Sequence, residues 1–319
     1  MLRLAHPRAA GPARRPGLLL VLVPLLALAG ACADDGSPPE ARELAGWQLT
    51  LAPDGRDLTL TRRDLPSLRL AGLAPAIRLD GVWHSCREYP RQRLEPLSGA
   101  GPLPPGWRLR CSGAEPELPA LRVELRPQGP RALEVTASAE GPVVGLEALA
   151  PLVSQGGVTL GSGPIAFLSN GYQSWSNSGG IRLPAEPPPA GIDPLLAQRD
   201  TDEWNRDGRY VSWWYGALAA ANGTALVVGS PGARRFRPSV TAWGPPEAVS
   251  LQGTSGGAGE RVGAAPGERI HAEPCWLAAG DDAWTLLREY AAALAGDAPP
   301  VGARPGGWNS WYAHFPDID

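Results

Sequence analysis

The sequence predicts a mainly β protein, in which a large antiparallel β-sandwich is followed by one helix and one further strand. Short segments in which apolar and polar residues alternate recur between Gly46 and Ala279, and this period of two is typical of half-buried strands. Glycine and proline, with 40 and 36 residues among the 319 of the chain, separate these segments and indicate turns. At Gly280 the alternation gives way to a helical period.

The first strand segments are separated by short turn signals. Trp47–Leu51 and Leu58–Leu60 flank Pro53-Asp54-Gly55, which predicts a hairpin. Asp80-Gly81 predicts another turn directly after Ile77–Leu79. Further segments alternate in the same way: Leu68–Leu70, Trp107–Cys111, Leu121–Leu125 and Leu133–Thr136. Many short strands with turns between them favour a large sandwich.

The segment Ala225–Gly229 differs from the others because it is apolar throughout. A short, continuously apolar run predicts a strand that is buried on both faces. Asn222-Gly223-Thr224, directly before it, predicts a hairpin turn. Together, these segments define a predicted N-terminal β-sandwich domain over residues 46–280.

A single helix is predicted after the sandwich, within a connecting segment over residues 281–306. Asp281 and Asp282 favour a helix N-cap, and Gly296 followed by Pro299-Pro300 ends the helix. The predicted buried face carries Trp284, Leu287, Tyr290, Ala291 and Leu294. The remainder of the segment is predicted to be a linker.

The first 32 residues have the layout of an export signal. Arginines precede an apolar run from Leu18 to Leu28, and the small residues Ala29–Ala31 lead to Cys32. The run is too short to cross the roughly 30 Å hydrocarbon core of a membrane. This order predicts a periplasmic or cell-surface lipoprotein with its lipid on Cys32; simple secretion, with Cys32 unmodified, is the alternative. Residues 33–45 are acidic and proline-containing, which predicts a tether.

Composition excludes several classes of function. The net charge is −3, and the 29 basic residues, all arginine, form no basic stretch of the kind that a nucleic-acid-binding protein needs. The four histidines are scattered and no Cys-x-x-Cys motif occurs. The sequence therefore predicts no metal site and no other cofactor.

Three further cysteines follow Cys32. Cys86 and Cys111 lie on two nearby strand-like segments, and an oxidising compartment would favour a disulfide between them. Two buried free thiols are the alternative, and both interpretations remain open at the level of sequence. Cys275 is predicted to be a small buried apolar residue.

The segment Gly307-Trp308-Asn309-Ser310-Trp311-Tyr312 resembles the first barrel strand of the clan D glycoside hydrolases. In that clan, a Gly-Trp-x-Ser-Trp core opens a catalytic (β/α)8 barrel, so the resemblance implies that residues 307–319 are the start of such a barrel, truncated at Asp319. Asn309 is the residue that family 27 carries at this position. A large sandwich before the barrel is a feature of family 36, so the domain order resembles the α-galactosidases (melibiases) of family 36.

A second motif lies inside the predicted sandwich. Asn170-Gly171-Tyr172-Gln173-Ser174-Trp175-Ser176 is similar to a segment in the N-terminal sandwich of many family 36 sequences, and Arg209–Tyr215 fits the same domain. The resemblance therefore covers residues 46–319. Trp213 and Trp214 are adjacent and would point to opposite faces of a strand, so at most one of them could serve a site.

The resemblance implies the N-terminal part of a retaining glycosidase that hydrolyses terminal α-galactosides. Its partners would be α-galactoside oligosaccharides or polysaccharides, and it would meet the membrane only through the lipid anchor. The two catalytic carboxylates of such an enzyme are Asp residues on later barrel strands. No catalytic residue is therefore expected in this chain, which alone would be inactive, and Asp317 and Asp319 are expected to start a helix.

Trp308, Tyr172 and Trp175 are the candidates for contact with the substrate. The resemblance implies that Trp308 lies at the mouth of the barrel, and the turn signal Ser169-Asn170-Gly171 predicts a loop tip that carries Tyr172 and Trp175. Twelve tryptophans against three phenylalanines favour sugar contact, because an indole offers an apolar face and an N–H donor. Packing is the alternative for each residue. A non-catalytic carbohydrate-binding lipoprotein and an envelope module without sugar affinity are the competing functions.

Overall fold

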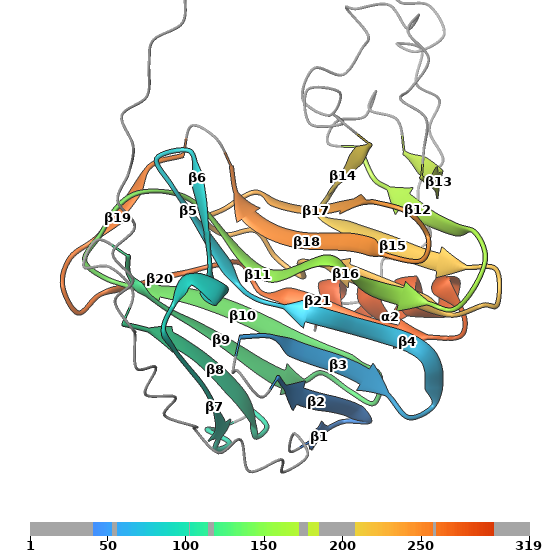
Figure 1. The fold of residues 1–319 in the computed structure, drawn as a ribbon, viewed down its shortest axis with the longest axis horizontal. Coiled ribbons are helices and arrows are strands. Elements are labelled where there is room, and N and C mark those ends of the chain that lie inside the picture. Colours follow the sequence, from blue (N-terminus) through green and yellow to red (C-terminus); the bar gives the residue numbers. More distant parts are fainter. Residues whose placement is uncertain are drawn as a thin grey trace, which may run out of the picture. The chain divides into compact units, whose positions relative to one another are not determined.

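The computed structural model describes residues 41–52, 56–101, 103–113, 118–171, 178–184, 208–257 and 260–296. Within these ranges, two antiparallel β-sheets pack face to face around an apolar core, together with one α-helix (Figure 1). The predicted mainly β sandwich is confirmed. The predicted export signal and barrel strand lie outside the described residues. In the described part, no helix is long and apolar enough to cross a membrane.

The first sheet, called sheet A, has 11 strands among the described residues. Its main path runs in the order β1 (Ala41–Leu44), β2 (Trp47–Leu51), β3 (Leu58–Arg62), β4 (Leu65–Leu73), β11 (Val143–Leu160), β18 (Val249–Gly256), β17 (Pro238–Trp243) and β14 (Arg209–Trp213). An arm of two strands, β5 (Ala76–Leu79) and β6 (Val82–Ser85), branches from β11, as does β19 (Val262–Ala264).

The second sheet, sheet B, has 10 strands within the same ranges. Its order is β13 (Gly179–Leu183), β12 (Ile165–Ser169), β15 (Tyr215–Ala220), β16 (Ala225–Gly229), β21 (Cys275–Gly280), β10 (Ala132–Glu140), β9 (Ala120–Pro127), β8 (Gly106–Ser112) and β7 (Arg91–Leu97). A short strand, β20 (Arg269–His271), also pairs with β10.

The strand β11 connects the two halves of sheet A. It pairs with β4 and β5 on one side, and with β18 and β19 on the other. A register irregularity between Ser154 and Val158 places a bulge in its middle. Gly157 is required in this bulge, because a Cβ atom there would collide with the carbonyl oxygen of Ala71. The bulge leaves Gln155 exposed on the outer face of the sheet.

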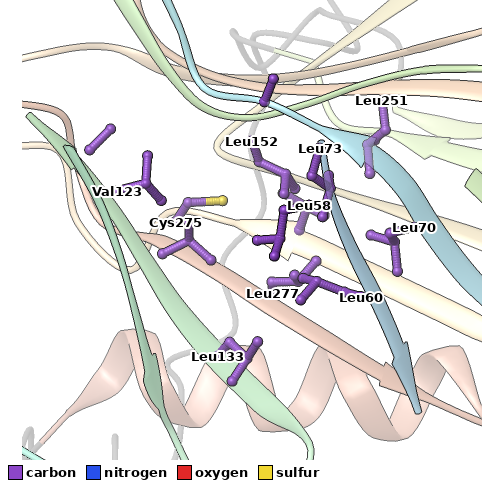
Figure 2. Close-up of a cluster of buried hydrophobic side chains, with 14 of the residues drawn as sticks. Leu58, Leu60, Leu70, Leu73, Val123, Leu133, Leu152, Leu251, Cys275 and Leu277 are labelled. Carbon is purple, nitrogen blue, oxygen red and sulfur yellow. The ribbon is translucent and has the colours of Figure 1, made fainter. Parts of the chain in front are cut away.

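The core between the sheets is built mainly from leucine side chains. Figure 2 shows leucines of β3, β4, β11 and β18 facing residues of β9, β10 and β21; the labelled ones are Leu58, Leu60, Leu70, Leu73, Val123, Leu133, Leu152, Leu251, Cys275 and Leu277. Trp47 is fully buried, and its indole Nε1 donates a hydrogen bond to the carbonyl oxygen of Arg131 at 3.1 Å. This bond satisfies the polar end of an otherwise apolar side chain.

The predicted hairpins are confirmed. β2 and β3 pair with Leu49 opposite Leu60, and β5 and β6 pair with Ile77 opposite His84. β15 and β16 are joined by the predicted turn, where Gly223 has a φ of +91°. Every residue of β16 is buried, as predicted, because the core covers one face of the strand and a helix covers the other.

That helix is α2 (Ala283–Ala295), which packs on the outer face of sheet B over β16 and β21 (Figure 1). Its ends are as predicted. The carboxylate of Asp282 accepts hydrogen bonds from the backbone N–H groups of Trp284 and Thr285 at the N-terminus, and Gly296 is the C-cap. The predicted location of the helix is therefore correct.

The predicted buried face of α2 is wrong in part. Leu286 and Tyr290 are buried, whereas Trp284 is 71 % exposed and Leu294 is 54 % exposed. The reason lies in the sheet. Gly229 leaves room for the ring of Tyr290, which belongs to both faces, and Gly280 leaves room for Leu286, whose Cδ2 would lie 3.2 Å from a Cβ atom there. The space above β16, and not the helical period alone, decides which face turns inward.

The start of the sandwich also differs from the prediction. Ala41–Leu44, predicted as part of a tether over residues 33–45, forms β1 and pairs with β2. The turn between β1 and β2 consists of Ala45 and Gly46, with φ values of +50° and +79°. Such a two-residue turn is favoured in hairpins, but alanine gives little sign of it in a sequence because its Cβ disfavours positive φ.

Candidate functional site

The first candidate region is the end of the sandwich where β12 meets β14. The Asn170–Ser176 motif begins here, but Tyr172 and Trp175 lie outside the described residues. The backbone N–H of Asn170 donates to Oγ of Ser212 at 2.6 Å, and its side-chain Nδ2 donates to the carbonyl of Trp213 at 3.0 Å. The N–H of Trp213 donates back to the carbonyl of Asn170 at 2.8 Å. These bonds fix the start of the motif to the opposite sheet.

The pair Trp213–Trp214 lies at the corner where the chain passes from β14 to β15. Trp213 is 2 % exposed and Trp214 is 37 % exposed, so Trp214 is the one of the two that a ligand could reach. The φ of Trp214 is +70°, a conformation that non-glycine residues rarely adopt. Its N–H donates to Pro238 at 3.1 Å and its carbonyl accepts from Ser230 at 2.8 Å. These backbone hydrogen bonds thus hold Trp214 in a strained backbone conformation, with its indole partly exposed.

The second candidate region is a cleft of about 390 Å³ on the outer face of sheet A. Aromatic, amide and charged side chains line it, including Trp83, Glu88, Gln155, Arg209, Trp243 and Gln252. Its volume lies within the range of small-molecule sites, roughly 300–1,000 Å³. We refer to this region as the cleft.

The floor of the cleft results from strand alternation. In β17, Val240 and Ala242 are buried in the core, so Trp243 projects from the opposite face. In β18, Leu251 is buried and Gln252 projects outward in the same way. The Nε2 atom of Gln252 donates a hydrogen bond to Oγ1 of Thr254 on the same strand at 2.9 Å, which orients the amide.

Trp243 is held between its neighbours on two strands. It pairs with Arg209 on β14 and with Ser250 on β18. The guanidinium carbon of Arg209 lies 4.6 Å from the centroid of the indole ring, a cation–π geometry. The arginine therefore covers the indole from the β14 side and restricts its rotation.

The β5–β6 arm and the short helix η1 (Cys86–Glu88) form the opposite wall. Trp83 on this arm is 38 % exposed. Glu88 accepts a hydrogen bond from the backbone N–H of Ser85 at 2.7 Å and lies 3.2 Å from Nδ1 of His84. The side chain of Ser85 caps η1 in return. The wall is thus ordered by its own hydrogen bonds.

A disulfide between Cys86 and Cys111 joins this wall to sheet B. The sequence leaves open whether these two cysteines form a disulfide or are free thiols, and the structure shows the disulfide. Cys86 belongs to η1 and Cys111 to β8, so the bond crosses from one sheet to the other. Next to it, the Nε atom of Arg87 donates to the Asp57 carboxylate at 2.5 Å, and its Nη2 donates to the carbonyl of Gly72 at 2.8 Å.

Sequence reasoning missed the cleft. Three of the eight tryptophans in the described ranges are buried, namely Trp47, Trp213 and Trp276, while Trp83, Trp214 and Trp284 are exposed. Trp107 and Trp243 are half-buried. The orientation of Trp243 is the one that matters for the cleft. The outward orientation of Trp243 could have been read from the alternation of Pro238–Trp243, but its place in one cleft with Trp83 depends on how distant strands pair.

Most of the remaining predicted residues fall outside the described part of the chain: Cys32, Trp308, Asp317 and Asp319. Cys275 is buried in the core, as predicted, and burial raises the pKa of its thiol to about 12. Within the described ranges, no group of three or more His, Cys, Asp or Glu side chains is arranged to hold a metal ion.

Several proteins of known structure contain a fold similar to this sandwich. No family model and no curated protein sequence matches the chain. Among solved structures, the α-N-acetylgalactosaminidase NagBb from Bifidobacterium bifidum, in complex with Gal-NHAc-DNJ, is similar with a TM-score of 0.50 at 9 % identity, over 79 % of this chain and 38 % of that one. The two-sheet fold of the sandwich is therefore similar to that of part of this structure.

Two other solved structures are similar at lower scores. The galactosidase domain of the α-galactosidase–sucrose kinase AgaSK gives a TM-score of 0.46 at 9 % identity, over 78 % of this chain and 41 % of that one. A variant of the family 36 α-galactosidase AgaA from Geobacillus stearothermophilus, in complex with raffinose, gives 0.45 at 9 % identity, over 77 % and 41 %. The chain thus spans about two fifths of the length of these structures.

Proposed function

We propose that this chain is the N-terminal part of an exported, α-galactosidase-like retaining glycosidase that acts on terminal α-galactosides. The observation that carries the proposal is the order along one chain: a two-sheet sandwich, the helix α2, and then Gly307-Trp308-Asn309-Ser310-Trp311-Tyr312. The fold likeness to NagBb supports the assignment of the sandwich. Because NagBb is an α-N-acetylgalactosaminidase, N-acetylated galactosides are the second substrate class to test.

In the proposed enzyme, the barrel supplies the catalytic carboxylates, and residues of both the barrel and the sandwich contact the sugar. A retaining glycosidase uses two carboxylates about 5–5.5 Å apart, one as nucleophile and one as acid and base. In this proposal both are Asp residues of the barrel and lie beyond the sandwich. Trp308, Tyr172 and Trp175 contact the sugar, whose C–H face stacks on an aromatic ring. The hydrogen bonds of Asn170 attach the first residue of the Asn170–Ser176 motif to β14.

The activity is tested with the product of the complete gene, purified from its own source. We expect hydrolysis of 4-nitrophenyl α-galactoside, with the α-anomer of galactose appearing first in the NMR spectrum because the reaction retains configuration. A Trp308→Ala variant should lose about tenfold or more in kcat/KM, as expected for an aromatic contact to the substrate. Absence of hydrolysis of both the galactoside and the N-acetylgalactosaminide would overturn the proposal.

Export and lipidation form a separate part of the proposal. Cys32 would become the first residue of the mature protein and carry the lipid. Metabolic labelling with a palmitate analogue should mark the natural protein and leave a Cys32→Ser variant unlabelled. Unlabelled natural protein that is found outside the cytoplasm would favour simple secretion instead.

A non-catalytic carbohydrate-binding protein is the second candidate function, and the cleft is the observation that favours it. Its aromatic and amide lining does not depend on a barrel. Sugar binding with no hydrolysis by the product of the complete gene would favour this function.

A further inference from the structure

We propose that the cleft on the outer face of sheet A is a carbohydrate-binding site. A neutral pyranose ring would stack on Trp243, and the amides of Gln252 and Gln155 would bind its hydroxyl groups. The inference goes beyond the glycosidase proposal, because every residue that it uses lies in the sandwich.

The orientation of Trp243 provides the stacking surface. Arg209 covers the indole from β14, the neighbouring strand on one side. The next strand on the other side is β18, which carries Gln252. The second face of the indole is therefore turned toward β18 and the cleft. A flat apolar surface beside polar groups suits a sugar, which presents C–H groups on its faces and hydroxyl groups at its edges.

The polar groups of the cleft match hydroxyl groups. A hydroxyl both donates and accepts, and a side-chain amide offers the complementary donor and acceptor on one planar group. Gln252 lies on the floor with its amide oriented by Thr254, and Gln155 is exposed on the bulge of β11. Glu88 adds a carboxylate from the opposite wall. These groups surround the space in front of Trp243.

The charges of the cleft favour a neutral ligand over an anionic one. The guanidinium of Arg87 is engaged by the carboxylate of Asp57 and the carbonyl of Gly72. Arg209 and the carboxylate of Glu88 contribute one positive and one negative charge to the lining of the cleft. The positive and negative side chains are therefore balanced, whereas a phosphate or sulfate site would need a surplus of positive charge.

The wall of the cleft is fixed before any ligand binds. The Cys86–Cys111 disulfide links η1 to sheet B, and the capping box formed by Ser85 and Glu88 orders η1 itself. A site whose walls are already ordered loses less conformational entropy on binding. Preorganisation of this kind is expected of a binding site and is not required of a passive surface.

The test uses the full chain and isothermal titration calorimetry with raffinose, a β-glucan oligosaccharide and a mannan oligosaccharide as neutral probes. We expect at least one probe to bind with a Kd on the order of millimolar or tighter, a binding free energy of about −4 kcal/mol. Trp243→Ala and Gln252→Ala should each weaken it by about tenfold or more. Trp284→Ala removes an exposed tryptophan of α2 outside the cleft and should leave the affinity unchanged.

The outcomes separate this site from the proposed catalytic one. Binding that survives Trp308→Ala but not Trp243→Ala supports the cleft. Binding that survives both Trp243→Ala and Trp83→Ala in folded protein, as judged by near-ultraviolet circular dichroism, overturns it. Failure of all neutral probes to bind, or binding of a sulfated oligosaccharide alone, also overturns it, and none of these results depends on whether the whole protein hydrolyses galactosides.

Discussion

At the scale of single residues, Gly72 is a position where any side chain would be strained. Its φ is +61°, and a Cβ atom would lie 2.6 Å from Nη2 of Arg87. The close approach exists because this guanidinium donates to the carbonyl of Gly72. The residue therefore links the conformation of β4 to the wall of the cleft.

We expect Gly72→Ala to lower the free energy of unfolding more than Gly81→Ala does. Gly81 also has a positive φ, +84°, but a Cβ atom there meets nothing within 4 Å. The control should therefore cost about 1–2 kcal/mol, from the backbone conformation alone. Gly72→Ala should cost about 1 kcal/mol or more beyond that, because Arg87 must move. Equal costs in denaturant unfolding would show that Arg87 does not restrict this position.

Cys275 leads to a prediction about pH. Burial raises the pKa of its thiol from 9.0 to about 12, so the folded protein holds the proton more tightly than the unfolded chain. Its contribution to stability is complete below pH 9 and is lost as the pH rises from 9 to 12, by about 1.4 kcal/mol per pH unit. The natural chain should therefore lose about 1.4 kcal/mol more than Cys275→Ala between pH 8 and pH 10 in denaturant unfolding. Parallel losses in the two proteins would contradict burial of the thiol.

At the scale of secondary-structure elements, α2 provides a test of which helical face is buried. Leu286 is 0 % exposed, whereas Leu294 is 54 % exposed. Leu286→Ala should therefore lower the free energy of unfolding by about 2–5 kcal/mol, since it leaves a cavity against β16 and β21. Leu294→Ala should change it by about 0.5 kcal/mol or less. The opposite ranking would restore the face that the sequence predicted.

The same helix shows how far the sequence determines an element. Its ends could be predicted because Asp282 and Gly296 act locally through backbone hydrogen bonds. Its face could not, because Leu286 and Leu287 are adjacent and permit two overlapping apolar faces. The choice depends on the sheet under the helix, where Gly280 leaves room for Leu286 and Gly229, far away in sequence, leaves room for Tyr290. Hairpins were predictable for the same reason as helix ends, since their strands and turns are contiguous.

The wall of the cleft can be tested through its disulfide. The bond closes a loop between cysteines separated by 25 positions, and a loop of this size predicts a stabilisation of about 3 kcal/mol. Replacement of both Cys86 and Cys111 by serine should lower the free energy of unfolding by about that amount, and should weaken sugar binding in the cleft. Dithiothreitol should destabilise the natural chain similarly and leave the double variant unchanged. If dithiothreitol also destabilises the double variant, the reductant acts at a site other than this disulfide.

At the scale of the whole molecule, the boundary between the sandwich and the segment after α2 can be mapped by limited proteolysis. The residues after Gly296 include several glycines and prolines, a composition that predicts an accessible linker over residues 297–306. Proteinase K, which cleaves after many residue types, should cleave there first and leave the sandwich with α2 as a resistant fragment. Trypsin does not suit this test, because Pro305 follows Arg304, the one basic residue of the segment. Mass spectrometry of the early products identifies the site. Resistance throughout this segment would argue against the domain boundary.

The candidate sites show the same division between local and distant information. The motif around Asn170 could be recognised because its residues are contiguous, and the structure adds only how Asn170 is attached to β14. The cleft could not be recognised, because Trp83 and Trp243 come from the β5–β6 arm and from β17. Only the pairing of these strands with β11 and β18 brings them to one surface. A single sequence contains no direct sign of such long-range pairing.

The position of β11 also limits when the protein can fold during synthesis. Its partners β4 and β5 precede it in the chain, but β18 and β19 on its other side end only at Gly256 and Ala264. Sheet A therefore cannot close until the residues up to Ala264 have left the ribosome, and pairings of this range form slowly. A nascent chain that stays open for so long would remain suitable for threading across a membrane, which is the order of events that the proposed export requires.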